Sequence, residues 1–197
     1  MNKLTKYLIG IDEAGRGPLA GPVSVGAVML NIQDLKEREK WFSGIKDSKK
    51  LSEKAREEWF AKMKKAKRDG WLKFAVAFGS ARMIDKKGIV FAIEYSLRQA
   101  LLKLGANPKK TTILLDGGLK APPKYIYQKT IIKGDEKEPV IALASIAAKV
   151  SRDRLMKKIS RKYPKYNFEK HKGYGTLGHY KKIKKHGVLP LHRKSFL

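Results

Sequence analysis

The chain has 197 residues, of which 45 are Lys or Arg and 18 are Asp or Glu, so its formal net charge at pH 7 is +27. A hydrophobic fraction of 42% is enough to build the core of one domain with a terminal extension. The charge predicts a polyanionic partner, nucleic acid before an acidic membrane surface, while the absence of Cys excludes disulfides and Cys-ligated zinc.

The first half of the chain is expected to form three strands and one helix. Residues 6–12 and 23–30 are typical of buried strands, and the Gly- and Pro-rich loop between them indicates a hairpin with a wide, rigid loop. Ser52 can N-cap a helix from residue 53 to about residue 67. The alternation of apolar residues over 71–78 predicts a third strand.

In the second half, helices and strands are expected to alternate. Residues 80–86 suit a short helical turn, and residues 89–104 carry the apolar stripe of a helix that Gly105 ends. The remaining expected elements are strands over 111–115 and 125–132, a long helix over 139–163, and a turn-rich tail that is helical to about residue 185. Three antiparallel strands followed by alternating helices and strands predict a mixed α/β sheet.

Nothing in the sequence predicts a membrane partner. The apolar stretch near the N-terminus is too short for a signal peptide, and acidic residues follow it directly. No run approaches the roughly 20 apolar residues of a membrane span, and the apolar face of an interfacial helix is missing. We therefore expect a cytoplasmic protein.

Positive charge is concentrated in the last quarter of the chain. Residues 149–197 contain 16 Lys or Arg and 2 acidic residues, whereas residues 1–148 contain 29 and 16. The last quarter is therefore the expected electrostatic contact surface, although a solvated, Lys-rich helical surface would give the same composition.

Four carboxylates follow the expected strands. Asp12 and Glu13 end the first strand, Asp116 closes the strand over 111–115, and Asp135 lies just past the strand over 125–132. Ligands gather at the carboxyl ends of strands in open α/β sheets. Clustered carboxylates raise one another's pKa, and a bound Mg²⁺ or Mn²⁺ relieves their repulsion. The pattern predicts a site for two-metal phosphodiester hydrolysis.

Each of these segments, taken alone, is also a common turn, so only their joint placement favours a metal site. Gly15-Arg16-Gly17 follows the first carboxylates directly. It is either ordinary loop chemistry or a place where backbone N–H groups and a cation approach a ligand. Tyr174, between two glycines, is either a packed aromatic or a ring that stacks on a sugar or base. The sequence contains neither a zinc-protease HExxH motif nor a P-loop.

Seven segments carry a resemblance to a known family, in the family's order and over nearly the whole chain. They are residues 10–23, 47–52, 115–117, 133–135, 144–153, 171–176 and 192–196. The first (GIDEAGRGPLAGPV) and the sixth (HKGYGT) are the most specific. The chain resembles ribonuclease HII of the bacterial type.

The resemblance implies a ribonuclease H-like mixed five-stranded sheet flanked by helices. Residues 1–160 would form the catalytic domain, and residues 161–197 a basic helical extension that completes the substrate cleft. The implied metal ligands and catalytic residues are Asp12, Glu13, Asp116 and Asp135, holding two divalent ions, Mg²⁺ or Mn²⁺. The implied substrate-binding residues are Gly15, Arg16, Gly17, Lys49, Lys149, Arg152, Lys172 and Tyr174.

The implied activity is that of a metal-dependent endoribonuclease. It would hydrolyse the RNA strand of RNA–DNA hybrids and cut 5′ of single ribonucleotides embedded in duplex DNA, leaving 3′-hydroxyl and 5′-phosphate ends. We expect a monomer. The alternative is a non-catalytic basic RNA- or DNA-binding protein, which the composition alone permits. The carboxylates argue against it, because a pure polyanion binder gains nothing from anions clustered on its binding face.

Overall fold

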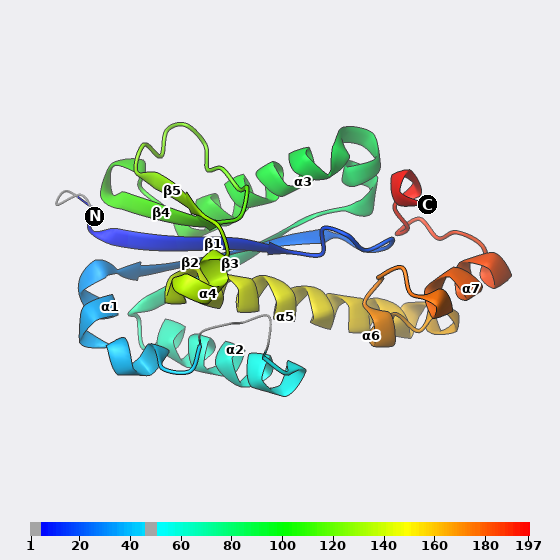
Figure 1. The fold of residues 1–197 in the computed structure, drawn as a ribbon, viewed down its shortest axis with the longest axis horizontal. Helices are drawn as coiled ribbons and strands as arrows, with labels where there is room; N and C mark the ends of the chain where they lie inside the picture. The colour runs from blue at the N-terminus through cyan, green and yellow to red at the C-terminus, as the bar shows by residue number, and fades with distance from the viewer. Residues whose placement is uncertain (1–4, 46–50) are drawn as a thin grey trace.

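The computed structural model describes residues 5–45 and 51–197, and a twisted five-stranded sheet forms its centre (Figure 1). The strands are β1 (Tyr7–Ala14), β2 (Val23–Asn31), β3 (Leu72–Gly79), β4 (Thr111–Asp116) and β5 (Gln128–Ile131). Their order is β3-β2-β1-β4-β5. The β1–β2 and β2–β3 pairs are antiparallel, and the β1–β4 and β4–β5 pairs are parallel. This arrangement confirms the mixed α/β sheet.

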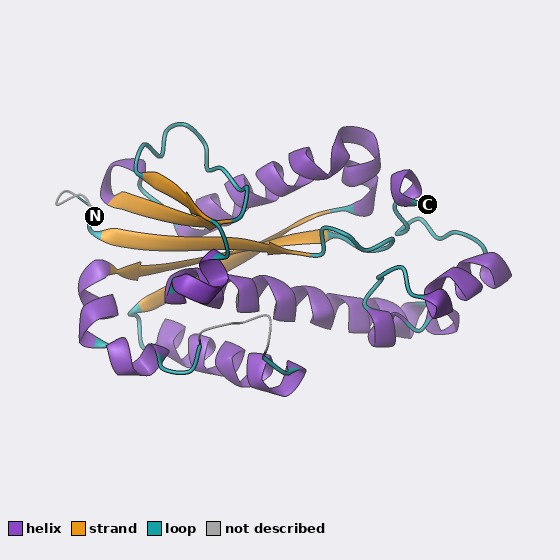
Figure 2. Cartoon of the chain, viewed as in Figure 1, coloured by secondary structure: helices purple, strands orange, loops and turns teal. Residues whose placement is uncertain are grey.

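Helices cover both faces of the sheet (Figure 2). The α-helices are α1 (Ile32–Glu37), α2 (Glu53–Arg68), α3 (Ala81–Leu104), α4 (Gly134–Lys137), α5 (Pro139–Lys162), α6 (Phe168–His171) and α7 (Leu177–His186). Short 3-10 helices span Glu39–Phe42, Pro108–Lys110, Pro164–Tyr166 and Lys194–Phe196. In the described part of the chain, no helix has the length and apolarity that crossing a bilayer requires.

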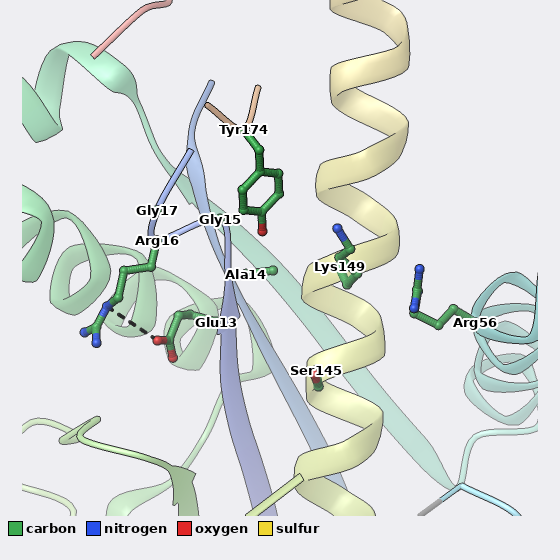
Figure 3. A pocket seen from close by; sticks show the side chains of 9 residues that line it. All are labelled: Glu13, Ala14, Gly15, Arg16, Gly17, Arg56, Ser145, Lys149 and Tyr174. Atoms are coloured by element: carbon green, nitrogen blue, oxygen red, sulfur yellow. Dashed lines mark ion pairs between the residues drawn. The ribbon is translucent and has the colours of Figure 1, made fainter. Parts of the chain in front are cut away.

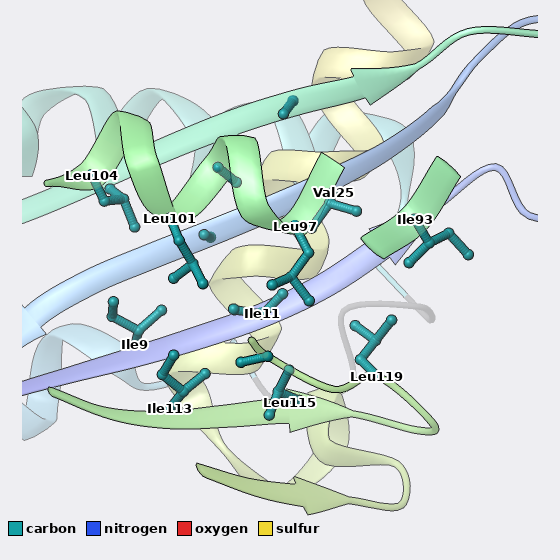
Figure 4. Packing of buried hydrophobic residues seen from close by; sticks show 14 of the residues in the cluster. Ile9, Ile11, Val25, Ile93, Leu97, Leu101, Leu104, Ile113, Leu115 and Leu119 are labelled. Carbon is teal, nitrogen blue, oxygen red and sulfur yellow. The ribbon is translucent and has the colours of Figure 1, made fainter. Parts of the chain in front are cut away.

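Strand β1 is buried on both faces, and its alternating side chains feed two different cores. Ile9 and Ile11 pack with Leu97 and Leu101 of α3 on one face (Figure 4). Leu8 belongs to the opposite core, beneath α5 and α2. Because successive strand residues point to opposite faces, the two carboxylates that end β1 separate: Asp12 continues the α5 face and Glu13 the α3 face.

Local sequence patterns account for most element boundaries. The Ser52 hydroxyl accepts a hydrogen bond from the Ala55 amide at 3.1 Å, which confirms the expected N-cap of α2. The expected break between a helical turn and a helix lies at Gly88, whose φ of 83° interrupts α3. Gly105 ends α3 in the left-handed conformation, as expected.

One expectation about the elements was wrong, and one helix was not foreseen. The strand predicted over residues 125–132 is only Gln128–Ile131. Its first residues instead form a turn, in which the Tyr125 amide donates to the Pro122 carbonyl and the Gln128 side chain bonds Ala121. Helix α1, directly after β2, was not predicted. The Asn31 side chain caps it by accepting from the Gln33 amide.

Candidate active site

The carboxyl ends of β1 and β4 meet at one edge of the site. The strands are parallel neighbours with Ile11 opposite Leu115, so Asp12 and Asp116 follow at the same level. Asp116 Oδ1 accepts a hydrogen bond from the Gly134 amide at 2.7 Å, which draws in the turn that carries Asp135. The three segments that the sequence placed at strand ends are therefore adjacent in the fold.

Asp12 is a strongly perturbed carboxylate. It is only 2% exposed, and its Oδ1 accepts the Glu13 amide at 2.7 Å. Its Oδ2 is buried and has no hydrogen-bond partner in the described structure. Burial raises the pKa of Asp12 well above its usual value, the charges of Glu13 and Asp116 raise it further, and the Ser145 side chain and the Glu13 amide only partly oppose the rise. Such a group favours a proton or a cation.

The donor set suits a hard divalent ion, because it consists of carboxylate oxygens, one of them buried without a partner. The surroundings of the side chains differ. Asp135 is fully buried, and Glu13 Oε1 lies 3.7 Å from Arg16 Nε. Across residues 5–45 and 51–197, no three His, Asp or Glu side chains already form a group that could hold an ion. Ion binding would therefore have to gather these carboxylates.

A cleft of about 360 Å³ opens beside the carboxylates, between the end of β1 and helix α5 (Figure 3). Its lining residues are Glu13, Ala14, Gly15, Arg16, Gly17, Arg56, Ser145, Lys149 and Tyr174. Tyr174 is 42% exposed, and Lys149 Nζ lies 5.7 Å from its ring centroid. The structure thus brings the Gly-Arg-Gly segment and Tyr174, which are far apart in sequence, to the lining of one cleft.

Arg152 corrects one expectation. Its guanidinium is fully buried and donates to the carbonyls of Pro22 (2.9 Å), Lys172 (3.0 Å) and Ala20 (3.2 Å). A side chain with no exposed surface cannot contact a phosphate, so Arg152 holds loops together instead. A Cβ on Gly15, whose φ is +87°, would lie 2.1 Å from Arg152 Nε, which explains why glycine is needed there.

The expected lysine contacts differ in accessibility. Lys149 Nζ pairs with Asp153 Oδ1 at 3.1 Å and remains at the cleft. Lys172 is only 9% exposed, and its ammonium donates to the Glu169 carbonyl. Lys49 lies outside the described residues. Lys149 is therefore the predicted lysine that the structure places at the cleft.

Comparison with known proteins agrees with the fold and the cleft. Residues 9–197 match the family model of ribonuclease HII. The chain is 47% identical over 195 residues to ribonuclease HII of Fusobacterium nucleatum, covering 98% of this chain and 86% of the relative. It is 43% identical over 197 residues to ribonuclease HII of Caldicellulosiruptor bescii, covering 100% and 89%. The chain belongs to the ribonuclease HII family.

Solved structures of ribonuclease HII and its relatives share the fold. A chain from the PCNA:RNase HII complex of Archaeoglobus fulgidus superimposes with a TM-score of 0.76 at 25% identity, covering 97% of this chain and 95% of that one. Ribonuclease H2 of Pyrococcus horikoshii gives 0.72 at 26% identity, covering 96% and 93%. These likenesses confirm the ribonuclease H-like fold class.

Membership of the ribonuclease HII family also confirms a metal-dependent endoribonuclease over a non-catalytic binder. The sequence interpretation missed Arg56 and Ser145, which line the cleft. Ser145 lies inside one of the segments that carried the resemblance, but the sequence did not show that its side chain lines the cleft. Arg56 faces the cleft from α2, and no local pattern distinguishes it from the other basic residues of that helix.

Proposed function

We propose that this protein hydrolyses the RNA strand of RNA–DNA hybrids and cuts 5′ of single ribonucleotides in duplex DNA, leaving 3′-hydroxyl and 5′-phosphate ends. Family membership supports this activity. The observation that carries it is the desolvated carboxylate of Asp12 beside Asp116 and next to Glu13, which lines a cleft in a strongly basic chain. Clustered anions are unfavourable at a polyanion-binding surface unless cations neutralise them.

In this proposal Asp12, Glu13, Asp116 and Asp135 hold two divalent ions, Mg²⁺ or Mn²⁺. Such ions, when bound, activate water and stabilise the leaving oxygen. Asp12 offers the buried oxygen without a partner, and its raised pKa reflects how poorly the metal-free site tolerates the charge. The hydrogen bond from the Gly134 amide orients Asp116.

The Gly-Arg-Gly segment and Tyr174, both in the cleft lining, would recognise the ribonucleotide. The 2′-hydroxyl distinguishes RNA from DNA at a single position, and the main chain of Gly15-Arg16-Gly17 can approach it closely. The Tyr174 ring is exposed and suits stacking on a sugar or base. Among the described residues, the Arg16 guanidinium pairs only with Glu13, and this ion pair is partly exposed. Because such pairs contribute little, Arg16 can exchange its partner for a phosphate.

Basic side chains would hold the phosphates and set the register rather than read sequence. Lys149, which lines the cleft, supports this role. We add Arg56 of α2, which also lines the cleft. Lys172 would contribute only if its ammonium group leaves the Glu169 carbonyl. The extension over residues 161–197 would complete the cleft, because it supplies Tyr174.

The decisive experiment uses an end-labelled DNA duplex with one ribonucleotide and a matched all-DNA duplex. With Mg²⁺ or Mn²⁺ we expect one cut, on the 5′ side of the ribonucleotide, and none in the control duplex or in EDTA. A protein that binds both duplexes in EDTA and cuts neither when metal is added would be the non-catalytic binder instead.

Replacing Tyr174 by Ala should impair cleavage at a lone ribonucleotide more than it impairs folding. A lost base–aromatic stacking contact is worth roughly 1–3 kcal/mol, or about tenfold to a hundredfold in kcat/KM. Tyr174→Phe keeps the ring and should retain most of the activity. Both variants should melt close to wild type, because the ring is already 42% exposed. A large drop in Tm with unchanged specific activity would assign Tyr174 to packing.

Binding should weaken steeply with salt, in part through the exposed Lys181, Lys184 and Lys185 of α7. Each phosphate contact contributes about 0.9 to the negative slope of log K against log salt for duplex DNA. Replacing all three by Gln should make the slope shallower by up to about 0.9 for each phosphate contact that is lost. The matched control replaces the exposed Lys73, Lys109 and Lys110. These residues lie near the ends of the strands that are farthest from the candidate active site. Equal slopes for both triple variants would place the footprint elsewhere.

A further inference from the structure

Arg193, which follows the Pro190–Leu191 turn near the C-terminus, reaches back to the lining of the cleft. Its guanidinium is fully buried. It donates to the carbonyls of Gly15 at 2.7 Å, Arg16 at 2.8 Å and Gly21 at 3.0 Å. One side chain therefore holds two carbonyls of the Gly-Arg-Gly segment and a third at the far end of the same loop.

These bonds also decide where the amide groups of the segment point. In a trans peptide, the C=O of one residue and the N–H of the next point in opposite directions. Holding the carbonyls of Gly15 and Arg16 on Arg193 therefore turns the N–H groups of Arg16 and Gly17 away from it. Both residues line the cleft, whereas Arg193 does not. The buried guanidinium thus presents amide donors to a ligand in the cleft.

The main chain ties the tail to the same loop. The Arg193 amide donates to the Leu19 carbonyl at 2.7 Å, and the Gly21 amide donates to the Leu191 carbonyl at 2.9 Å. Ala20 and His192 form an antiparallel β-bridge between these two bonds. This short two-stranded contact of the main chain positions the Arg193 side chain at the loop.

His192 connects to Tyr174, another residue of the cleft lining, through a chain of hydrogen bonds whose direction is determined. The Leu189 amide donates to His192 Nδ1 at 2.8 Å, so the proton of this ring lies on Nε2 and faces His179 Nε2 at 3.1 Å. His179 must then accept at Nε2 and carry its proton on Nδ1, which donates to the Tyr174 carbonyl at 3.0 Å. Each ring is neutral and fully buried or nearly so.

We propose that His192 and Arg193 are positioning residues that fix the Gly-Arg-Gly segment and Tyr174 relative to each other, Arg193 through the Gly15 and Arg16 carbonyls and His192 through His179 and the Tyr174 carbonyl. The inference rests on the proposed function, because it assumes that these two parts of the cleft lining hold the ribonucleotide. It predicts that the tail sets the geometry of recognition without touching the substrate.

The chemistry of the contact explains the choice of arginine. Burial lowers the pKa of Arg193 to about 10, so the guanidinium remains charged at neutral pH. A buried charge is tolerated only when its N–H groups are hydrogen-bonded. A lysine would bring the same charge but not the planar fork that meets three carbonyls at once. A change of Arg193 to Lys therefore keeps the charge and removes the geometry of the hydrogen bonds.

The first test compares Arg193→Lys and Arg193→Gln on the duplex with one ribonucleotide. We expect both to lower kcat for the lone ribonucleotide on the order of 100-fold, as a misplacement of about 1 Å can do, while the Kd for the all-DNA duplex stays close to wild type. Lys194→Gln, which removes one exposed charge from the next position, is the matched control. Wild-type kcat and KM in both Arg193 variants, or a lower Tm with unchanged activity of the folded fraction, would overturn the proposal.

His192 provides a second test, which also decides the case if neither Arg193 variant folds. A Gln amide nitrogen can stand where Nε2 stands and keep the bond to His179, whereas Asn is too short and reaches only the Leu189 amide. We expect His192→Asn to lose about tenfold or more in cleavage at the lone ribonucleotide and His192→Gln to retain most of it. Equal activities of the two variants would refute the connection to Tyr174.

The wild-type enzyme separates failure of the inference from failure of the proposed function. If wild type shows no ribonucleotide-dependent cut with either metal, the proposed function is wrong. If wild type cuts as expected and the Arg193 and His192 variants cut equally well, only the positioning role is wrong.

Discussion

Replacing Asp12 by Asn is expected to abolish cleavage and, at the same time, to stabilise the metal-free protein. Asp12 is buried, carries an oxygen without a hydrogen-bond partner, and lies beside the charges of Glu13 and Asp116. Asn removes the charge that this environment disfavours. It also removes a metal ligand, and because metal ions supply several kcal/mol of transition-state stabilisation, kcat should fall at least about 100-fold.

The sign of the pH dependence follows from the direction of the pKa shift. A carboxylate whose pKa is raised on folding contributes stability below its usual pKa and loses that contribution as the pH rises through the raised value. In EDTA, the Asn variant should therefore exceed wild type in Tm by more at pH 8 than near about pH 3, below the ordinary Asp pKa, where Asp12 is largely protonated in both states. Divalent metal should raise the Tm of wild type more than that of the variant.

The measurement combines cleavage assays, duplex binding and thermal melts with and without metal. Asp69→Asn, at the exposed C-terminal end of α2, is the matched control and should change neither activity nor the response to metal. Duplex binding should survive in the Asp12 variant, because the phosphates are held by Lys and Arg. Near-wild-type turnover in saturating Mg²⁺ would remove Asp12 from the catalytic site.

Replacing Gly10 by Ala should be among the most destabilising single changes in the chain. Helix α5 crosses β1 so closely that a Cβ at Gly10 would lie 2.3 Å from the backbone carbon and oxygen of Val140 and 2.6 Å from the Ile141 nitrogen. These are backbone atoms, so no side-chain rotation relieves the clash and the helix must move. Overpacking of this kind costs about 1–3 kcal/mol and occasionally more, or roughly 2–4 °C of Tm per kcal/mol at this size.

The same change should reduce activity, because α5 also carries Ser145 and Lys149 into the cleft. Gly118→Ala is the matched control for stability, since a Cβ at that position would have no atom of the described residues within 4 Å apart from Gly118 itself and its chain neighbours. Thermal melts of the two variants decide the matter. A Gly10 variant as stable as the Gly118 variant would show that the contact between β1 and α5 can relax at little cost.

The family resemblance and the local patterns in the sequence were informative for different parts of the molecule. Alternation, helix caps and glycines act over a few residues, so the first four strands, the Ser52 cap and the break at Gly88 could all be predicted. The expected β5 was too long because buried Tyr125 fits a strand pattern as well as the turn it forms. The placement of carboxylates after strands also predicted which segments would meet.

The sequence by itself thus determined the family, the mixed sheet and the strand-end positions of Asp12, Glu13 and Asp116. Only the tertiary structure decided which basic residues face a ligand. Arg152 and Arg193 are as basic as Lys149, yet they are buried because they satisfy carbonyls 130 and 178 residues away in sequence, at Pro22 and Gly15. No local pattern encodes such contacts, because a guanidinium is stable in the interior only where the folded chain brings several acceptors to it.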